Sequence, residues 1–216
     1  MGQYNFDQII DRTHTKSLKY DFAVKRGKPA DVLPFWVADM DFEIPPELKQ
    51  ILLDRVNHGV FGYTESDDEY FDVLQNWFST RFNWIPEQKW LVKTPGIVFA
   101  LAMAVRAFTK EGEGVLINQP VYYPFSMVIE DNNRRLINVP LIKGEERYTI
   151  DFEGIERAIF EENVTLFLLC NPHNPVGRVW TEDELKRLGD ICIKHNVLIV
   201  SDEIHADFVW KGHTHK

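Results

Sequence analysis

The stretch "VTLFLLCNPHNPVGRVW", residues 164–180, joins an apolar run to a loop that contains two Asn-Pro pairs. An uninterrupted run of Val, Leu and Phe is typical of a strand that is buried on both faces of a sheet. The loop after it is rigid and non-helical, because proline lacks an N–H group and restricts the residue before it. A structural turn needs only one Pro or Gly. We therefore interpret this loop as a ligand-binding element in which the Asn174 amide can donate to a ligand oxygen.

Similar apolar runs alternate with amphipathic segments on both sides of this stretch. The pattern predicts strands over 114–120, 135–142, 164–172 and 196–203, with helices over 122–133, 151–163 and 181–195 between them. Thr181 and Glu184 form a capping box that marks the start of the last helix. This alternation predicts an α/β fold with three layers, in which a mainly parallel sheet is covered by helices on both faces.

The first part of the chain differs, because residues 1–46 show little periodicity. After Pro45–Pro46 a helix is predicted whose apolar face contains Leu48, Ile51, Leu52 and Val56 and which ends at Gly59. A second helix is predicted to begin with a capping box made by Ser66 and Glu69. A third, starting at Ile97, is expected to be largely buried and to end near Gly112.

Composition narrows the class of protein. The 216 residues are 44% hydrophobic and 26% charged, enough to bury a core, and the net charge of −9 argues against nucleic acid as the main partner. Cys170 and Cys192 lie in no CxxC or ligand-spaced cluster, which favours reduced thiols. The N-terminus has no apolar signal region and no apolar run is long enough to span a membrane. We expect a cytoplasmic protein without a membrane partner.

Two further segments are candidates for ligand binding. In "KTPGIVFA", residues 93–100, the backbone N–H groups of Gly96 and Ile97 begin a helix and could hold an anion, although an ordinary loop is the simpler interpretation. In "NQPVYYPF", residues 118–125, Tyr122 or Tyr123 could stack on a planar ligand, or both could simply pack at the edge of the sheet.

A carboxylate follows the last predicted strand in "VLIVSDEIHADFVW", residues 197–210. Burying Asp202 is costly unless a positive group pairs with it, so the position predicts a cationic ligand, a helix cap or a salt bridge to an arginine. A metal site is another hypothesis for this region, since His205, His213 and His215 lie close in sequence to Asp202 and Asp207. Scattered surface histidines would explain the same pattern.

Five segments in order, "FGYT", "TPGIV", "PVYYPF", "NPHNPVGRVW" and "SDEIHADFVW", resemble the pyridoxal-phosphate enzymes of the aspartate-aminotransferase fold, the class I/II aminotransferases of fold type I. Within them, "LPFWVADMDF" and "SDEIHADFVW" are similar to C–S β-lyases of the MalY/PatB (cystathionine β-lyase) type. The resemblance covers nearly the whole chain. It implies that residues 1–46 belong to the small domain and the substrate side. Residues 47–216 would be the N-terminal, incomplete part of the large domain that binds pyridoxal 5'-phosphate.

The resemblance also implies roles for individual residues. Asp202 would pair with the pyridinium nitrogen of the cofactor and keep it protonated, Asn174 would hydrogen-bond the phenolic oxygen, and Tyr122 would stack on the ring. The remaining implied positions are Gly96 and Ile97 at the phosphate, His205 near the phenolic oxygen in place of the more common tyrosine, Tyr63 at the phosphate of a neighbouring subunit, and Trp36 and Asp39 on the substrate side. A role for Tyr63 across subunits implies a homodimer.

One element of the family is missing from these residues. The Schiff-base lysine is expected roughly thirty residues beyond the aspartate, and Lys211 and Lys216 are too close to Asp202 and lack its sequence context. No catalytic residue is therefore assigned, and the 216-residue chain alone is expected to be inactive. It would represent a little over half of an enzyme.

For the full-length parent, the resemblance implies β-elimination from a sulfur-containing amino acid, giving a thiol or homocysteine with pyruvate and ammonia. Transamination is the main alternative, because both reactions use the same cofactor and the residues present hardly distinguish them. A catalytically inert fragment or binding remnant is the alternative of another class.

Overall fold

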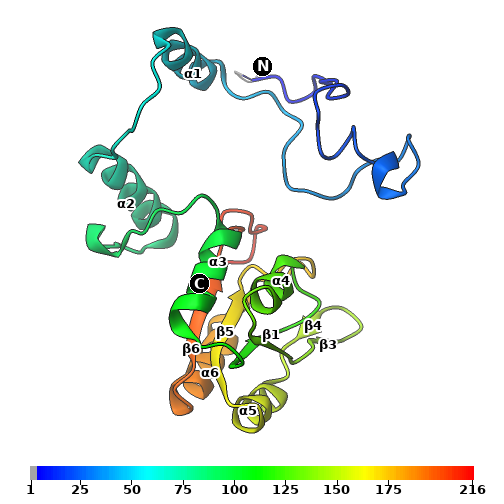
Figure 1. Cartoon of the computed structure of the whole chain (residues 1–216), viewed down its shortest axis with the longest axis vertical. Coiled ribbons are helices and arrows are strands. Elements are labelled where there is room, and N and C mark those ends of the chain that lie inside the picture. Colours follow the sequence, from blue (N-terminus) through cyan, green and yellow to red (C-terminus); the bar gives the residue numbers. More distant parts are fainter. Residues whose placement is uncertain (1–3) are drawn as a thin grey trace. The chain divides into compact units, whose positions relative to one another are not determined.

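The computed structural model describes residues 4–216 and divides the chain into two compact units, Met1–Glu65 and Ser66–Lys216 (Figure 1). This division falls after the first helix, whereas the boundary expected from the sequence lies at residue 46. That boundary concerns which residues join the small domain of a longer protein, and it stays a prediction.

The first unit is mostly irregular, as predicted. It contains the short 3-10 helix η1 (Val24–Arg26) and the helix α1 (Pro46–His58). Pro46 occupies the first turn of α1, and Gly59 ends the helix with φ of 73°, a left-handed conformation that glycine adopts without strain. The predicted helix is confirmed, and within its unit none of its residues is buried.

The second unit is built on a four-stranded sheet with the order β2-β1-β5-β6. The strands are β1 (Gly114–Ile117), β2 (Arg135–Asn138), β5 (Val164–Cys170) and β6 (Leu198–Asp202), and every pair between them is parallel. β5 is an interior strand. Both of its faces are therefore covered, which explains why its apolar run has no polar interruption except Thr165.

Helices cover both faces of this sheet, so the predicted three-layer α/β fold is confirmed. On one face, Leu166 and Leu168 of β5 pack with residues of α3 (Ile97–Phe108) and α4 (Pro124–Glu130). On the other face, Phe167 and Leu169 pack with residues of α5 (Phe152–Glu161) and α6 (Glu182–Lys194). The alternation of side chains along a strand sends neighbouring residues into the two separate cores.

Several predicted boundaries are confirmed and others are wrong. The capping box of Thr181 and Glu184 at the start of α6 is present. The helix α2 (Asp68–Phe82) is capped by Asp67, which accepts from the Tyr70 N–H at 3.2 Å, and not by Ser66, whose hydroxyl accepts from Lys93. The short 3-10 helix η2 (Gln88–Trp90) follows α2.

Two other expectations need correction. The strand predicted over 135–142 ends at Asn138, and Ile142–Lys143 (β3) instead pairs antiparallel with Tyr148–Thr149 (β4) in a separate hairpin. Helix α3 ends at Phe108 rather than near Gly112. Only Leu101 and Val105 in it are buried, because a single face of the helix meets the sheet.

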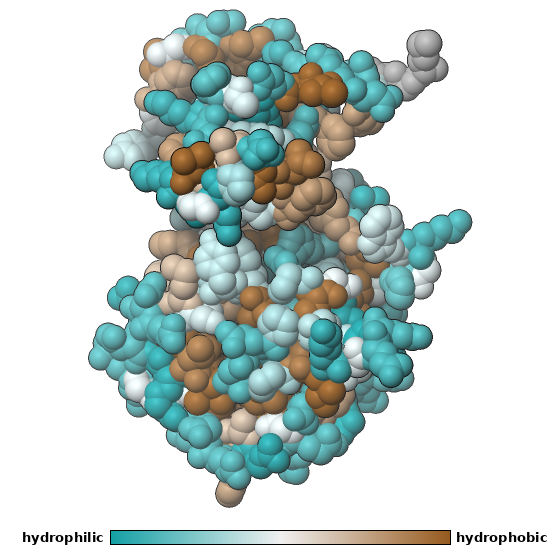
Figure 2. Space-filling view, turned by 90° about the vertical axis from the view of Figure 1, so that its right-hand side faces the viewer, coloured by the Kyte–Doolittle hydropathy of each residue, from teal (hydrophilic) through white to brown (hydrophobic). Residues whose placement is uncertain are grey.

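Apolar side chains also reach the surface, and brown patches interrupt the hydrophilic face drawn in Figure 2. In the part of the chain that the structure describes, no helix combines the length and the apolar character needed to cross a membrane.

Candidate functional site

The carboxyl ends of β1, β5 and β6 lie at the same edge of the sheet because these strands are parallel neighbours. The segment after β1 carries Tyr122, the one after β5 carries Asn174, and β6 itself ends at Asp202, which is in register with Cys170. In open α/β sheets this edge is where ligands bind. The fold therefore gathers three of the predicted residues at one edge.

Asp202 is a buried carboxyl, with 7% of its surface exposed. The Ile204 N–H donates to its Oδ1 at 3.1 Å, and no lysine, arginine or histidine among residues 4–216 forms an ion pair with it. Burial raises the pKa of the Asp202 carboxyl above its usual range, and the hydrogen bond from Ile204 and the charge of His205 only partly oppose this. The salt bridge or helix cap considered as alternatives for this residue is not found within the described chain.

Tyr122 lies close enough to Asp202 for their charges to interact. Partial burial raises the pKa of the Tyr122 phenol, and the charges of Tyr123 and Asp202 raise it further. The rings of Tyr122 and Tyr123 meet edge to face, with centroids 5.2 Å apart. Tyr122 is the less exposed of the two (37% against 67%), which favours it as the residue that faces the site.

The Asn174 side chain is half-buried and makes no hydrogen bond to any of residues 4–216. Its backbone N–H donates to the Cys170 Sγ at 3.4 Å. Burial raises the pKa of the Cys170 thiol to about 11, so the thiol stays protonated and is not a nucleophile at neutral pH. Because the Asn174 amide makes no hydrogen bond within residues 4–216, it remains available to a ligand.

Gly96 and Ile97 lie at the start of α3, which packs against β5 and β6 through Leu101 and Val105. No side chain caps this helix, and a Cβ added to Gly96 would meet no atom within 4 Å. The N–H groups of the first turn therefore lack a side-chain acceptor, and the side of Gly96 where a Cβ would stand is open. That combination suits an anion.

His205 follows Asp202 by three residues, and its charge acts on the carboxyl. Its ring meets Phe208 at 6.4 Å. The metal hypothesis gains no support, because no group of three or more His, Cys, Asp or Glu side chains within residues 4–216 is arranged to hold an ion. Instead, the His215 Nε2 pairs with Glu203 at 3.1 Å.

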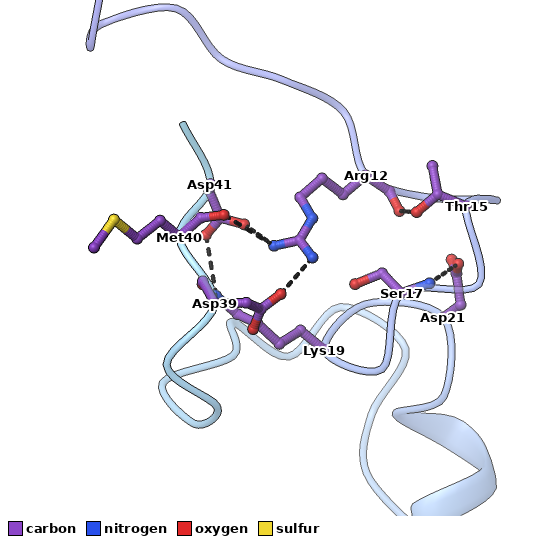
Figure 3. Close-up of polar contacts among 8 residues, drawn as sticks. All are labelled: Arg12, Thr15, Ser17, Lys19, Asp21, Asp39, Met40 and Asp41. Atoms are coloured by element: carbon purple, nitrogen blue, oxygen red, sulfur yellow. Dashed lines mark hydrogen bonds and ion pairs between the residues drawn. The ribbon is translucent and has the colours of Figure 1, made fainter. Parts of the chain in front are cut away.

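The other predicted residues, Trp36, Asp39 and Tyr63, belong to the first unit. Tyr63 is fully exposed there, and the Arg26 guanidinium lies over the Trp36 ring at 5.5 Å. Asp39 is already paired, because the Arg12 Nη2 donates to its carboxylate (Figure 3). Its negative charge is therefore compensated within its own unit.

The Arg12 Nη1 also donates to the Asp41 Oδ1 at 2.6 Å, and the Lys19 Nζ donates to the Asp41 Oδ2 at 3.1 Å (Figure 3). Hydrogen bonds from Arg12 and then Lys19 lower the pKa of Asp41. Sequence reasoning missed Arg12 and Lys19, since nothing in their local context indicates pairing with carboxylates more than twenty positions away.

Sequence reasoning also gave no role to His173, although it lies between the two Asn-Pro pairs. The side chain is buried, with 3% exposed, and its Nε2 lies 3.0 Å from the Pro120 carbonyl oxygen. A histidine inside a loop already regarded as ligand-binding was the available signal.

Comparison with known proteins agrees with this architecture. The chain is 43% identical over 211 residues to the cystathionine β-lyase PatB of Bacillus subtilis, and 36% identical over 213 residues to the protein MalY of Escherichia coli. These matches cover 98% of this chain but only 54% and 55% of the relatives. The chain therefore spans about half the length of the curated relatives it matches.

Solved structures give the same result. Cystalysin from Treponema denticola, whose crystal structure contains pyridoxal 5'-phosphate, superposes with a TM-score of 0.91 at 41% identity, covering 98% of this chain and 54% of that one. A pyridoxal-phosphate-bound aminotransferase-like protein from Clostridium difficile gives 0.93 at 47% identity, covering 98% and 55%. The family model for aminotransferase class I and II matches residues 30–216. As its sequence motifs implied, the chain belongs to the aminotransferase class I and II family.

Proposed function

We propose that this chain carries the cofactor-binding part of a pyridoxal-phosphate-dependent C–S β-lyase. The observation that supports the cofactor most strongly is the buried Asp202 carboxyl, which has no cationic partner among residues 4–216. A pyridinium ring is a planar cation that would compensate the negative charge of the Asp202 carboxylate. Tyr122 and Asn174 at the same sheet edge offer a stacking face and a free amide, so the residues present fit the group.

Each residue then has a role in holding the cofactor. Asp202 keeps the pyridinium nitrogen protonated, and Asn174 donates to the phenolic oxygen with His205 nearby. Tyr122 lies against the ring, while the N–H groups of Gly96 and Ile97 receive the phosphate. When bound, the cofactor supplies an electron sink for the bond changes at the substrate's Cα.

Three residues of the first unit also have proposed roles in the whole enzyme. Trp36 and Asp39 shape the substrate side, and the ion pair between Asp39 and Arg12 means that Asp39 orients Arg12 rather than presenting a free negative charge. Tyr63, fully exposed in its unit, would reach the phosphate bound by a neighbouring subunit. The functional form is then a homodimer.

The proposed reaction is β-elimination from a sulfur-containing amino acid. With cystathionine and one water molecule, the products are homocysteine, pyruvate and ammonia, so the atoms balance. The similarity to PatB supports this class of substrate. We place the protein in the cytoplasm, acting on a small molecule without a nucleic-acid or membrane partner.

Transamination is the second candidate, since an aspartate aminotransferase of Sulfolobus acidocaldarius is 25% identical over 193 residues. The higher identity to PatB favours the lyase. Assaying the whole protein with cystathionine, and separately with an amino acid and 2-oxoglutarate, tests the choice. Elimination predicts pyruvate and a free thiol without 2-oxoglutarate. Amino-group transfer that requires 2-oxoglutarate would overturn the assignment.

The 216 residues themselves are proposed to bind the cofactor without turning over. Lys216 pairs with Glu182 at 3.1 Å, and neither Lys216 nor Lys211 has the spacing expected of a Schiff-base lysine. Phosphate, stacking and Asp202 contacts then hold the cofactor non-covalently. For the isolated chain, the alternative of a catalytically inert fragment would then be correct.

A further inference from the structure

Two loops at the sheet edge carry residues proposed to hold the cofactor. Tyr122 lies in residues 118–123, after β1, and Asn174 lies in residues 171–180, after β5. The relative position of these loops decides how far the stacking ring lies from the donating amide. Within residues 4–216, the His173 side chain links the two loops through a hydrogen bond to the Pro120 carbonyl.

This hydrogen bond has a defined direction. The His173 Nε2 lies 3.0 Å from the Pro120 carbonyl oxygen, which can only accept, so Nε2 carries the proton. Burial lowers the pKa of His173, which keeps the imidazole neutral at neutral pH. Nδ1 is then without a proton, and it is buried with no hydrogen-bond partner in the described chain. The ring is held in one tautomer by a contact that reaches across to the other loop.

A stack of side chains supports the imidazole from behind. The Trp180 ring meets it edge to face at 5.4 Å, and the Arg178 guanidinium lies over Trp180 at 4.6 Å. The Trp180 Nε1 donates to the Cys170 carbonyl at 2.9 Å. Arg178 Nη2 makes bonds of 2.7 Å to both carboxylate oxygens of Glu184, in the first turn of α6. His173 therefore has little freedom to change its rotamer.

On its other side, the 118–123 loop is anchored to the end of β2 and to the residue that follows it. Asn118 Nδ2 donates to the Val139 carbonyl at 2.8 Å, and the Gln119 N–H donates to Asn138 Oδ1 at 3.0 Å. These contacts fix the beginning of the loop. The hydrogen bond from His173 fixes its middle, two residues before Tyr122.

We propose that His173 is a positioning residue: its hydrogen bond to Pro120, braced by Trp180 and Arg178, sets the spacing between Tyr122 and Asn174. The inference rests on the proposed function in one respect, that these two residues hold a planar cofactor. The loop linkage itself is independent of any ligand. No contact of His173 with substrate or cofactor is proposed.

Three substitutions in the 216-residue chain test the proposal. His173→Gln places an amide N–H near the position of Nε2 and keeps the donor. His173→Asn introduces the same chemical group with a shorter reach, and is the matched control. His173→Phe keeps a ring against Trp180 but has no donor, so it reports the lost bond without leaving a cavity.

Two readouts are needed, one of them without cofactor. Hydrogen–deuterium exchange of the ligand-free chain should be about five- to tenfold faster in residues 118–123 for His173→Asn and His173→Phe, the effect of losing one buried hydrogen bond. Exchange in β1 and β5 should not change. Titration with pyridoxal phosphate, followed by visible circular dichroism, should show roughly tenfold weaker binding for these two variants. His173→Gln should stay within about twofold of wild type in both measurements.

Faster exchange spread equally over β1, β5 and the loops would show a purely structural role and overturn the proposal. Unchanged exchange in residues 118–123 of both donor-free variants would overturn it as well. If the loop exchange responds as expected but the wild-type chain binds no pyridoxal phosphate, the proposed function falls while the loop linkage stands.

Discussion

Burying the Asp202 carboxyl at a sheet edge carries an electrostatic cost that no ion pair in the described chain offsets. Because its pKa is raised in the folded state, the sign of its effect on stability follows directly. Its contribution is most favourable at pH values below its unfolded pKa and is lost as pH rises through the folded value. Once ionised, the Asp202 carboxylate therefore opposes folding, as expected of a residue kept for binding.

Asp202→Asn should consequently have opposite effects on folding and on binding. We expect the unfolding free energy at pH 7, from urea titration, to stay the same or rise, since the amide carries no charge. The affinity for pyridoxal phosphate should fall roughly 30-fold or more, as when one partner of a buried charge pair is removed. Asp190→Asn, at an exposed position of α6, is the control and should change neither quantity. Wild-type affinity in Asp202→Asn would refute the role of Asp202.

At the scale of elements, α5 and α6 are joined by Glu156, which pairs with the Lys194 Nζ at 2.7 Å and the His195 Nε2 at 3.0 Å. Lys194 first, and then His195, lower the pKa of Glu156 to about 2. A lowered carboxyl pKa contributes stability that is present above the unfolded pKa, near 4.5, and is lost as pH falls toward 2.

We therefore expect Glu156→Gln to reduce the difference in unfolding free energy between pH 7 and pH 3. The effect should weaken at high salt, because the pair is solvent-exposed and screened. Urea unfolding at the two pH values measures it. Glu161→Gln, at the exposed end of the same helix, should leave the difference as in wild type. If both variants reduce this difference equally, the ion pairs of Glu156 make no specific contribution to stability.

The start of α2 gives a second test at this scale. Asp67 accepts from the Tyr70 N–H, so Asp67→Ala should lower the unfolding free energy by about 1 kcal/mol. Asp72→Ala makes the same substitution inside the exposed face of the helix, where alanine is favourable, and should be neutral or slightly stabilising. If thermal unfolding shows no difference between the two variants, Asp67 is not the functional cap.

At the scale of the whole molecule, the sequence was informative where its signals were local. The uninterrupted run of β5, the capping box of α6 and the Pro and Gly at the ends of α1 each indicated their element correctly. Tyr122, Asn174 and Asp202 were predictable together because the ends of parallel strands share an edge.

Other features depended on contacts that sequence does not encode locally. Ser66, Asp67 and Asp68 are all good capping residues in succession, and only the backbone geometry selects Asp67. The pairing of β3 with β4 replaced the second half of a predicted strand. The partner of His173 lies 53 residues away, and that of Arg12 lies 27 away at Asp39, so neither pair could be read from spacing.

We propose that these residues form a cofactor site without the lysine that would fix the cofactor covalently. Titrating the 216-residue chain with pyridoxal phosphate, recording visible circular dichroism and then adding borohydride before dialysis tests it most directly. We predict a saturable induced signal, and no chromophore attached to the protein after borohydride treatment and dialysis. The absence of a saturable signal, or a chromophore that stays attached to a lysine, would contradict it.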